Sequence, residues 1–117
     1  MTLFVCYPKC STCKKAAQWL TGKGIDCVSR DIRLDRPSLE ELSRWQELSG
    51  LPMKKFFNTS GQQYKALGLK DRLPTMSRQE QLELLSSDGM LVKRPILVRE
   101  DTVLVGFRES AWEQALL

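Results

Sequence analysis

The sequence predicts a single α/β domain in which a βαβ unit and a ββα unit are separated by a helical insertion. Two observations support this prediction. Short apolar runs with the character of buried strands lie near the two ends of the 117-residue chain, and the segment between them has two helix-capping signatures. A chain of this length forms one domain with its own core, so we expect the domain to span 1–117 and the insertion to span 38–87.

The first unit begins with the apolar run 3–6, which predicts a short buried strand that the segment 7–9 ends. A helix is expected next, because apolar residues recur at the i, i+3, i+4 and i+7 positions of one helical face. These residues are Cys13, Ala16, Ala17 and Leu20. Glycines at 22 and 24 end this helix, and residues 25–32 predict a second strand. The βαβ connection is expected to be right-handed.

The insertion is expected to be helical throughout. Ser38 and Ser77 each precede a glutamate by three residues, which is the spacing of a capping box. The first box predicts a helix that ends at Gly50, and the second predicts a helix through about Leu85. Short helical turns are expected between the two helices.

The last unit is expected to return to strands. The apolar runs 95–98 and 103–106 are separated by four polar residues, which predicts an antiparallel hairpin. A closing helix follows, with Trp112, Ala115 and Leu116 on one face. Together, βαβ, a helical insertion and ββα predict a thioredoxin-type core whose middle part is replaced by a helical module.

The strand-to-helix turn holds the Cys-x-x-Cys sequence of Cys10, Ser11, Thr12 and Cys13. A helix start offers unpaired N–H groups and a positive dipole end, so it favours a thiolate at Cys10. The backbone N–H groups of Ser11 and Thr12 would contribute to an anion-binding nest. Cys13 has two interpretations: it is the resolving thiol that closes a disulfide with Cys10, or it is a core thiol at the head of the helix's apolar face.

The chain has no histidine, which excludes Cys-His nucleophilic catalysis and histidine-containing metal sites. Cys6 and Cys27 lie in expected strands and are interpreted as core residues. A four-cysteine zinc site is the alternative, but its spacing lacks the paired Cys-x-x-Cys knuckles of structural zinc, so we expect no metal.

The net charge of +4 is a mild basic bias, and the basic pairs are scattered along the chain. We therefore expect no direct nucleic-acid binding, and a small anionic substrate or an acidic protein surface fits the charge better. No apolar stretch reaches the roughly 20 residues of a membrane span, and the N-terminus has no secretory pattern. The sequence predicts a cytoplasmic monomer with reduced thiols.

Four segments together resemble the arsenate reductase/Spx family of thioredoxin-fold proteins, which have a glutaredoxin-like core. The segments are 7–16, 56–61, 93–96 and 105–108, and they follow one another in the order of the family. The resemblance implies that Cys10 is the nucleophile, that Arg94 and Arg108 hold an oxyanion, and that Pro95 is the cis-proline of thioredoxin folds. It implies no bound cofactor, and thioredoxin or glutaredoxin with glutathione as the external reductant.

Two positions differ from the arsenate reductases of this family. Asn58 stands where those enzymes have a further arginine, and Cys13 is a second cysteine that they lack. The Cys-x-x-Cys form is instead similar to Spx-type regulators, which bind the RNA polymerase α-subunit and use the pair as a redox switch. The leading prediction is therefore a thiol oxidoreductase that acts on a small oxyanion or a disulfide. The alternatives are an Spx-like regulator and a structural relative without a redox cycle.

Overall fold

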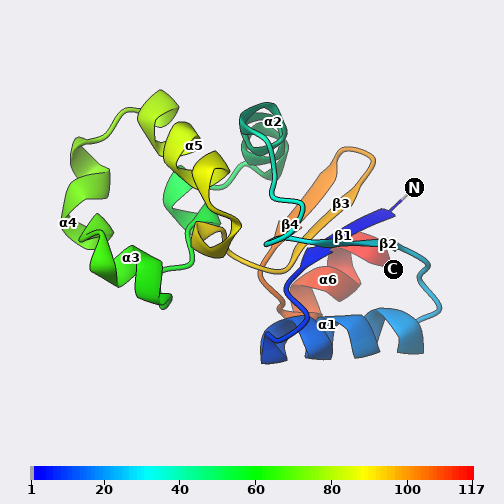
Figure 1. Cartoon of the computed structure of the whole chain (residues 1–117). Coiled ribbons are helices and arrows are strands. Elements are labelled where there is room, and N and C mark those ends of the chain that lie inside the picture. Colours follow the sequence, from blue (N-terminus) through cyan, green and yellow to red (C-terminus); the bar gives the residue numbers. More distant parts are fainter. Residues whose placement is uncertain (1) are drawn as a thin grey trace.

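The structure is a computed structural model that describes residues 2–117 and is built on a mixed four-stranded sheet (Figure 1). The strands lie in the order β2-β1-β3-β4, where β1 is Thr2–Cys6, β2 is Val28–Asp31, β3 is Ile96–Arg99 and β4 is Thr102–Val105. Strand β1 pairs in parallel with β2 and antiparallel with β3, and β3 pairs antiparallel with β4. The predicted βαβ and ββα units are confirmed.

Helices cover both faces of this sheet (Figure 1). Helices α1 (Ser11–Gly22) and α6 (Glu109–Leu116) pack on one face, where Phe4 of β1 joins Trp19 and Trp112 in one cluster. Val5 points to the opposite face, as alternation along a strand requires, and packs with the insertion, including α2 (Leu39–Ser49). This layered arrangement is the predicted thioredoxin-like fold.

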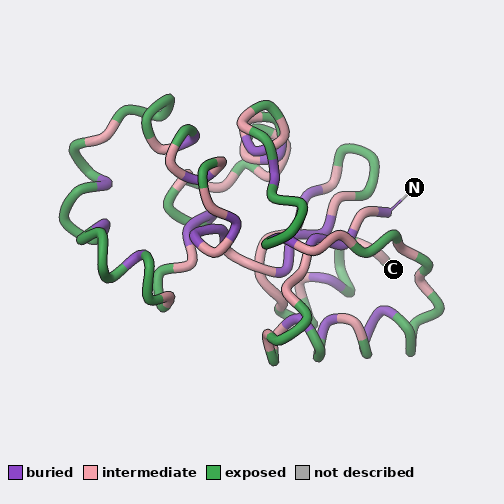
Figure 2. Tube along the Cα trace, viewed as in Figure 1, coloured by how far each residue is buried: buried purple, intermediate pink, exposed green. Residues whose placement is uncertain are grey.

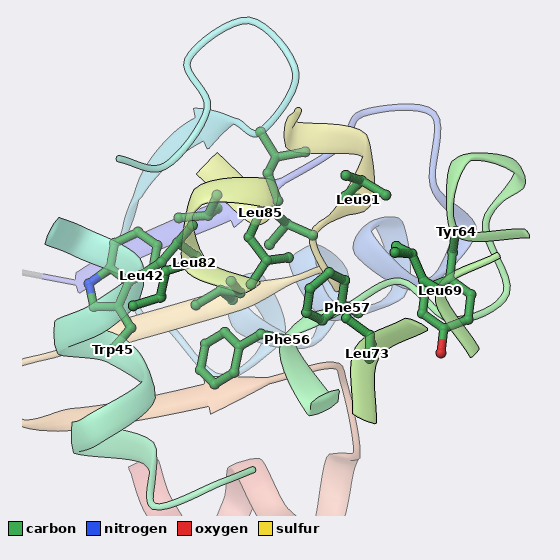
Figure 3. Packing of buried hydrophobic residues seen from close by; sticks show 14 of the residues in the cluster. Leu42, Trp45, Phe56, Phe57, Tyr64, Leu69, Leu73, Leu82, Leu85 and Leu91 are labelled. Carbon is green, nitrogen blue, oxygen red and sulfur yellow. The ribbon is translucent and has the colours of Figure 1, made fainter. Parts of the chain in front are cut away.

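The insertion between β2 and β3 is helical, as predicted. After α2 it consists of the short helices η1 (Met53–Phe56), α3 (Gln62–Ala66), α4 (Leu69–Arg72) and η2 (Leu73–Thr75), then α5 (Arg78–Ser87) and η3 (Gly89–Leu91). Its buried leucines and aromatic rings form one hydrophobic cluster with apolar residues of the sheet (Figure 3). Both predicted capping boxes are present, because Ser38 and Ser77 each accept the N–H of the glutamate three residues later at 3.1 Å.

The second strand is shorter than the predicted 25–32. Strand β2 begins at Val28, so Cys27 precedes it, and Cys6 and Cys27 are half-buried and pack against the edge of the core cluster below the sheet instead of lying within it. The start of β2 is poorly covered because β2 is an edge strand that pairs on one side only, and Val28 is 49% exposed. Cys6 lies at the end of β1, where the chain leaves the sheet.

The chain makes a close crossing where the insertion returns to the sheet. A Cβ at Gly89 would lie 1.8 Å from the carbonyl oxygen of Ile32, so only glycine fits there. Within residues 2–117, no helix is long and apolar enough to cross a membrane.

Candidate active site

Cys10 lies at the start of α1, as predicted. The chain leaves β1 through a tight turn in which the Cys10 N–H donates to the carbonyl of Tyr7 at 2.9 Å. Cys10 is the extended residue that caps α1, and its own carbonyl accepts the N–H of Lys14 at 3.1 Å. Its thiol therefore lies beside the free N–H groups of the first helical turn.

The environment of Cys10 lowers the pKa of its thiol below 9.0. Burial by itself would raise this pKa, but donors from three residues outweigh it: the N–H and thiol of Cys13, the N–H of Thr12, and the Arg94 guanidinium. All of these groups stabilise a negative sulfur. Cys10 is thus the more acidic thiol of the pair, which suits a nucleophile.

Cys13 has the opposite character. Its side chain is only 3% exposed, and burial raises the pKa of its thiol to about 12, helped by the negative charge of the Cys10 thiolate. The backbone N–H of Tyr7 donates to its sulfur at 3.3 Å and opposes this shift only in part. Both thiols are free in this structure. Cys13 therefore stays protonated while Cys10 ionises.

Arg94 lies beside Cys10, and Pro95 follows it directly before β3. The Arg94–Pro95 peptide bond is cis, which confirms the expected cis-proline. The Arg94 guanidinium stacks over the Tyr7 ring at 5.3 Å and donates to the carbonyls of Met90 and Val92 at 3.3 and 3.5 Å. Arginine planes stack well on aromatic faces, so Tyr7 holds this cation in place near Cys10.

A cavity of about 510 Å³ opens at Cys10. It is lined by Cys10, Thr12, Asn58, Ser60, Gly61, Gln62, Gln63, Met90, Lys93 and Arg94. Of the predicted site residues, the structure brings Cys10, Thr12 and Arg94 to this wall. Cys13 lies buried behind it, and Ser11 is exposed on the first turn of α1.

Arg108 lies elsewhere. It is exposed at the start of α6 and lines a separate cavity of about 220 Å³ with residues of β4, including Val103 and Val105. Its role in binding an oxyanion stays a prediction. Among residues 2–117 no group of three or more acidic or cysteine side chains is placed to hold a metal ion.

The family resemblance pointed to position 58 of the insertion, but the sequence did not predict how the insertion reaches this cavity. Two backbone hydrogen bonds tie the insertion to the segment before β3: the Asn58 N–H donates to Leu91 at 2.7 Å, and the Lys93 N–H donates to Phe56 at 2.8 Å. They surround a bridge between Phe57 and Val92. This pairing places Asn58 and Lys93 in one wall. The only signal in the sequence was the resemblance of 56–61 and 93–96 to family segments, which gave no geometry.

Comparison with known proteins gives a consistent result. The family model of the ArsC family matches residues 6–115. The uncharacterised protein YusI of Bacillus subtilis is 51% identical over 95% of this chain and 94% of its own length. The regulatory protein MgsR of the same organism is 32% identical over 89% of this chain and 81% of its own length. The global transcriptional regulator Spx of Enterococcus faecalis is 30% identical over 88% of this chain and 76% of its own length.

Two solved structures are similar over nearly the whole chain. One is a protein from Bacteroides fragilis whose description relates it to the ArsC family, with 55% identity, a TM-score of 0.95 and coverage of 97% of this chain and 95% of that one. The other, from Streptococcus mutans, is described as a possible arsenate reductase, with 47% identity, a TM-score of 0.89 and coverage of 99% and 98%.

Proposed function

We propose, from the premise that this chain belongs to the ArsC family, that it is a thiol-dependent oxidoreductase of arsenate-reductase type. The observation that supports this most directly is the unequal pair of thiols: an acidic Cys10 at the cavity and a protonated Cys13 behind it. An enzyme that forms and then resolves a bond to sulfur needs this inequality, because one thiol attacks first and the other waits.

In the first step the Cys10 thiolate attacks the oxidised substrate. With a disulfide, an S–S bond breaks, the new bond joins Cys10 to one half, and the other half leaves as a thiolate. With arsenate, a sulfur–arsenic bond forms and an oxygen leaves as water after protonation. Arg94 stabilises the negative charge in either case, because its guanidinium is always charged and fits an oxyanion through two donors.

In the second step Cys13 loses its proton and attacks the sulfur of Cys10. The electron pair of the bond between Cys10 and the substrate leaves with the product, as a thiolate or as arsenic in the trivalent state. The substrate gains two electrons and the protein is left with a Cys10–Cys13 disulfide. An external dithiol system, thioredoxin or glutaredoxin with glutathione, reduces this disulfide by exchange.

The test is steady-state arsenate reduction with thioredoxin and, separately, with glutaredoxin plus glutathione. Turnover should vanish in Cys10→Ser, and no Cys10–Cys13 bond should form in that variant under mild oxidation. Cys6→Ser is the matched control, since Cys6 lies on β1 outside the cavity lining and should leave both results unchanged. Loss of the disulfide in both variants would show that the pairing proposed here is wrong.

A second candidate is a regulator that senses oxidants through the same two thiols. The likeness to MgsR and Spx favours it, because those relatives are regulatory proteins. On this view the Cys10–Cys13 bond changes a surface that binds RNA polymerase through its α-subunit, and turnover is not required. No turnover with either reductant, together with a disulfide that changes the affinity for purified RNA polymerase, would favour this candidate over the enzyme.

A further inference from the structure

The wall of the Cys10 cavity has an uneven distribution of charge. Lys93 and Arg94 are the only basic residues of its lining within residues 2–117, and both come from the segment before β3. The residues that the insertion contributes are uncharged: Asn58, Ser60, Gly61, Gln62, Gln63 and Met90. A ligand therefore meets cations from one segment and amides and hydroxyls from the other.

Asn58 is the member of the insertion side that the structure holds most firmly. Its N–H donates to the Leu91 carbonyl at 2.7 Å, and its carbonyl accepts the Gly61 N–H at 3.1 Å, which closes a tight turn. The Ser60 hydroxyl donates to its side-chain oxygen at 3.4 Å. The backbone of Asn58 is thus held by two hydrogen bonds before any ligand arrives, and its carboxamide has one long contact with the Ser60 hydroxyl.

The Asn58 carboxamide occupies the space that a side chain at position 61 would need, so its position depends on Gly61 having none. A Cβ at position 61 would lie 2.6 Å from Nδ2 of Asn58, 3.2 Å from its Cγ and 3.2 Å from its backbone oxygen. A Cβ contact of 2.6 Å essentially never occurs, so a side chain at 61 would push the carboxamide aside, and it would also lie tightly against the Asn58 carbonyl. The Asn58 side chain and the missing side chain of Gly61 form one unit, which we name the Asn58–Gly61 lock.

We infer that Asn58, held by the Asn58–Gly61 lock, determines the substrate selectivity of the Cys10 cavity. It presents an uncharged carboxamide and so favours organic electrophiles that carry an amide group and at most one negative charge. Compact multiply charged oxyanions are disfavoured. This inference rests on the proposed function only for the identity of Cys10 as nucleophile, and within that function it selects a disulfide with an amide-bearing substituent.

One physical argument supports this selection. The cavity of about 510 Å³ is of the size that encloses a drug-sized molecule, so a lone tetrahedral oxyanion would leave most of it filled with water. The Asn58 carboxamide gives an amide-bearing substituent a partner in that space.

The test measures the alkylation of Cys10 by iodoacetate, which is anionic, and iodoacetamide, which is neutral and carries an amide. In each reaction the Cys10 sulfur forms a bond to carbon and iodide leaves, so no turnover is needed. The protein carries Cys13→Ser, and mass spectrometry of the Cys10 peptide separates alkylation of Cys10 from that of the half-buried Cys6 and Cys27. We expect Asn58→Arg to raise the iodoacetate-to-iodoacetamide rate ratio about fivefold or more, and the isosteric Asn58→Asp to lower it by a similar factor. An unchanged ratio in both variants would overturn the inference.

The Asn58–Gly61 lock is tested by a double-mutant cycle. Gly61→Ala should slow alkylation by iodoacetamide about three- to tenfold, which corresponds to a lost hydrogen bond. In an Asn58→Ala background the same change should have a smaller effect, because the carboxamide is gone and only the tight contact with the backbone oxygen of residue 58 remains. Equal effects in both backgrounds would refute the lock, and far-ultraviolet circular dichroism identifies a variant that fails to fold.

These outcomes are separate from those of the proposed function. Shifted ratios with no arsenate turnover would support the selectivity of Asn58 and leave a disulfide as the substrate. Arsenate turnover with ratios that do not depend on position 58 would leave the enzyme proposal intact and overturn this inference.

Discussion

The two thiols differ in acidity although only two residues separate them. Cys10 is the residue before the helix, where N–H groups are free, and Cys13 is inside the helix, where burial dominates. A strand-to-helix turn with this spacing places one sulfur at the surface and the other against the core. The difference in pKa between the thiols is therefore a property of the turn and the helix, to which Arg94 adds.

The contribution of Arg94 can be measured through the pH dependence of Cys10. Its guanidinium is one of the groups that lower the Cys10 pKa, so Arg94→Ala should raise that pKa and shift the alkylation profile to higher pH. Near neutral pH the alkylation rate should fall about three- to tenfold, since fewer molecules hold a thiolate. An unchanged rate would remove Arg94 from the site.

Arg108→Ala is the matched change at the second predicted arginine. Because Arg108 lines the cavity beside β4 and not the Cys10 cavity, we expect the alkylation profile to stay within about 0.2 pH units of the unmodified protein. A shift as large as that of Arg94→Ala would place Arg108 at the thiol after all.

At the scale of elements, an ion pair of Arg30 with the capping-box glutamate stabilises the start of α2, whereas the capping-box glutamate of α5 has no ion pair of this kind in the described part of the chain. Glu41 of the first capping box receives two hydrogen bonds from Arg30, at 2.6 and 2.9 Å. Arg30 also donates to the carbonyls of Asp35 and Arg36, so one guanidinium fastens the loop between β2 and α2. Glu80 of the second capping box has no such partner among the described residues.

Glu41→Gln should therefore destabilise the fold more than Glu80→Gln does. We expect a loss of about 1 kcal/mol for Glu41→Gln, reduced from a buried pair because Glu41 is partly exposed, and little change for Glu80→Gln. The Arg30 guanidinium lowers the Glu41 pKa below 4.5, so the difference is fully present above pH 4.5 and disappears as the pH falls through that lowered value. Urea denaturation at pH 7 and pH 3 would measure it, and equal losses at both values would contradict the assignment.

The crossing at Gly89 gives a second prediction at this scale. Gly89→Ala would force the new methyl group against the Ile32 carbonyl, so we expect a loss of about 3 kcal/mol or more. Gly22→Ala is the control: nothing lies within 4 Å of its Cβ, and the change should stabilise α1 by about 0.5–1 kcal/mol. Thermal unfolding of both variants measures the contrast. A mild effect at Gly89 would mean that η3 can move away from Ile32.

Across the whole molecule, burial is unevenly distributed. Figure 2 shows long exposed stretches in the part of the insertion that holds α3 and α4, whereas β1 and β3 lie in the interior of the sheet. Helices of five and four residues are not stable by themselves and depend on Tyr64, Leu69 and Leu73 for packing. Hydrogen exchange should therefore be faster in α3 and α4 than in β1 and β3 by about two orders of magnitude or more. Similar rates in both regions would show that the domain opens only as one unit.

Local features of the fold and the site could be predicted from the sequence. The two capping boxes, the thiol turn and the hairpin depend on residues close together in the chain. The cis-proline came from the family resemblance. The ends of β2 could not be predicted, because they depend on which strands lie beside it. The resemblance pointed to position 58, but the placement of Asn58 and Lys93 in one wall could not be predicted, since it follows from the bridge between Phe57 and Val92.

That bridge also has a thermodynamic consequence. It joins the insertion to the segment that holds Arg94 and Pro95, so the complete cavity exists only while the insertion is folded. A ligand that needs the complete cavity must then stabilise the insertion against opening by the same free energy by which the folded insertion strengthens its binding. The slowing of amide exchange in α3 on addition of a ligand would therefore measure, without an activity assay, how strongly that ligand prefers the assembled site.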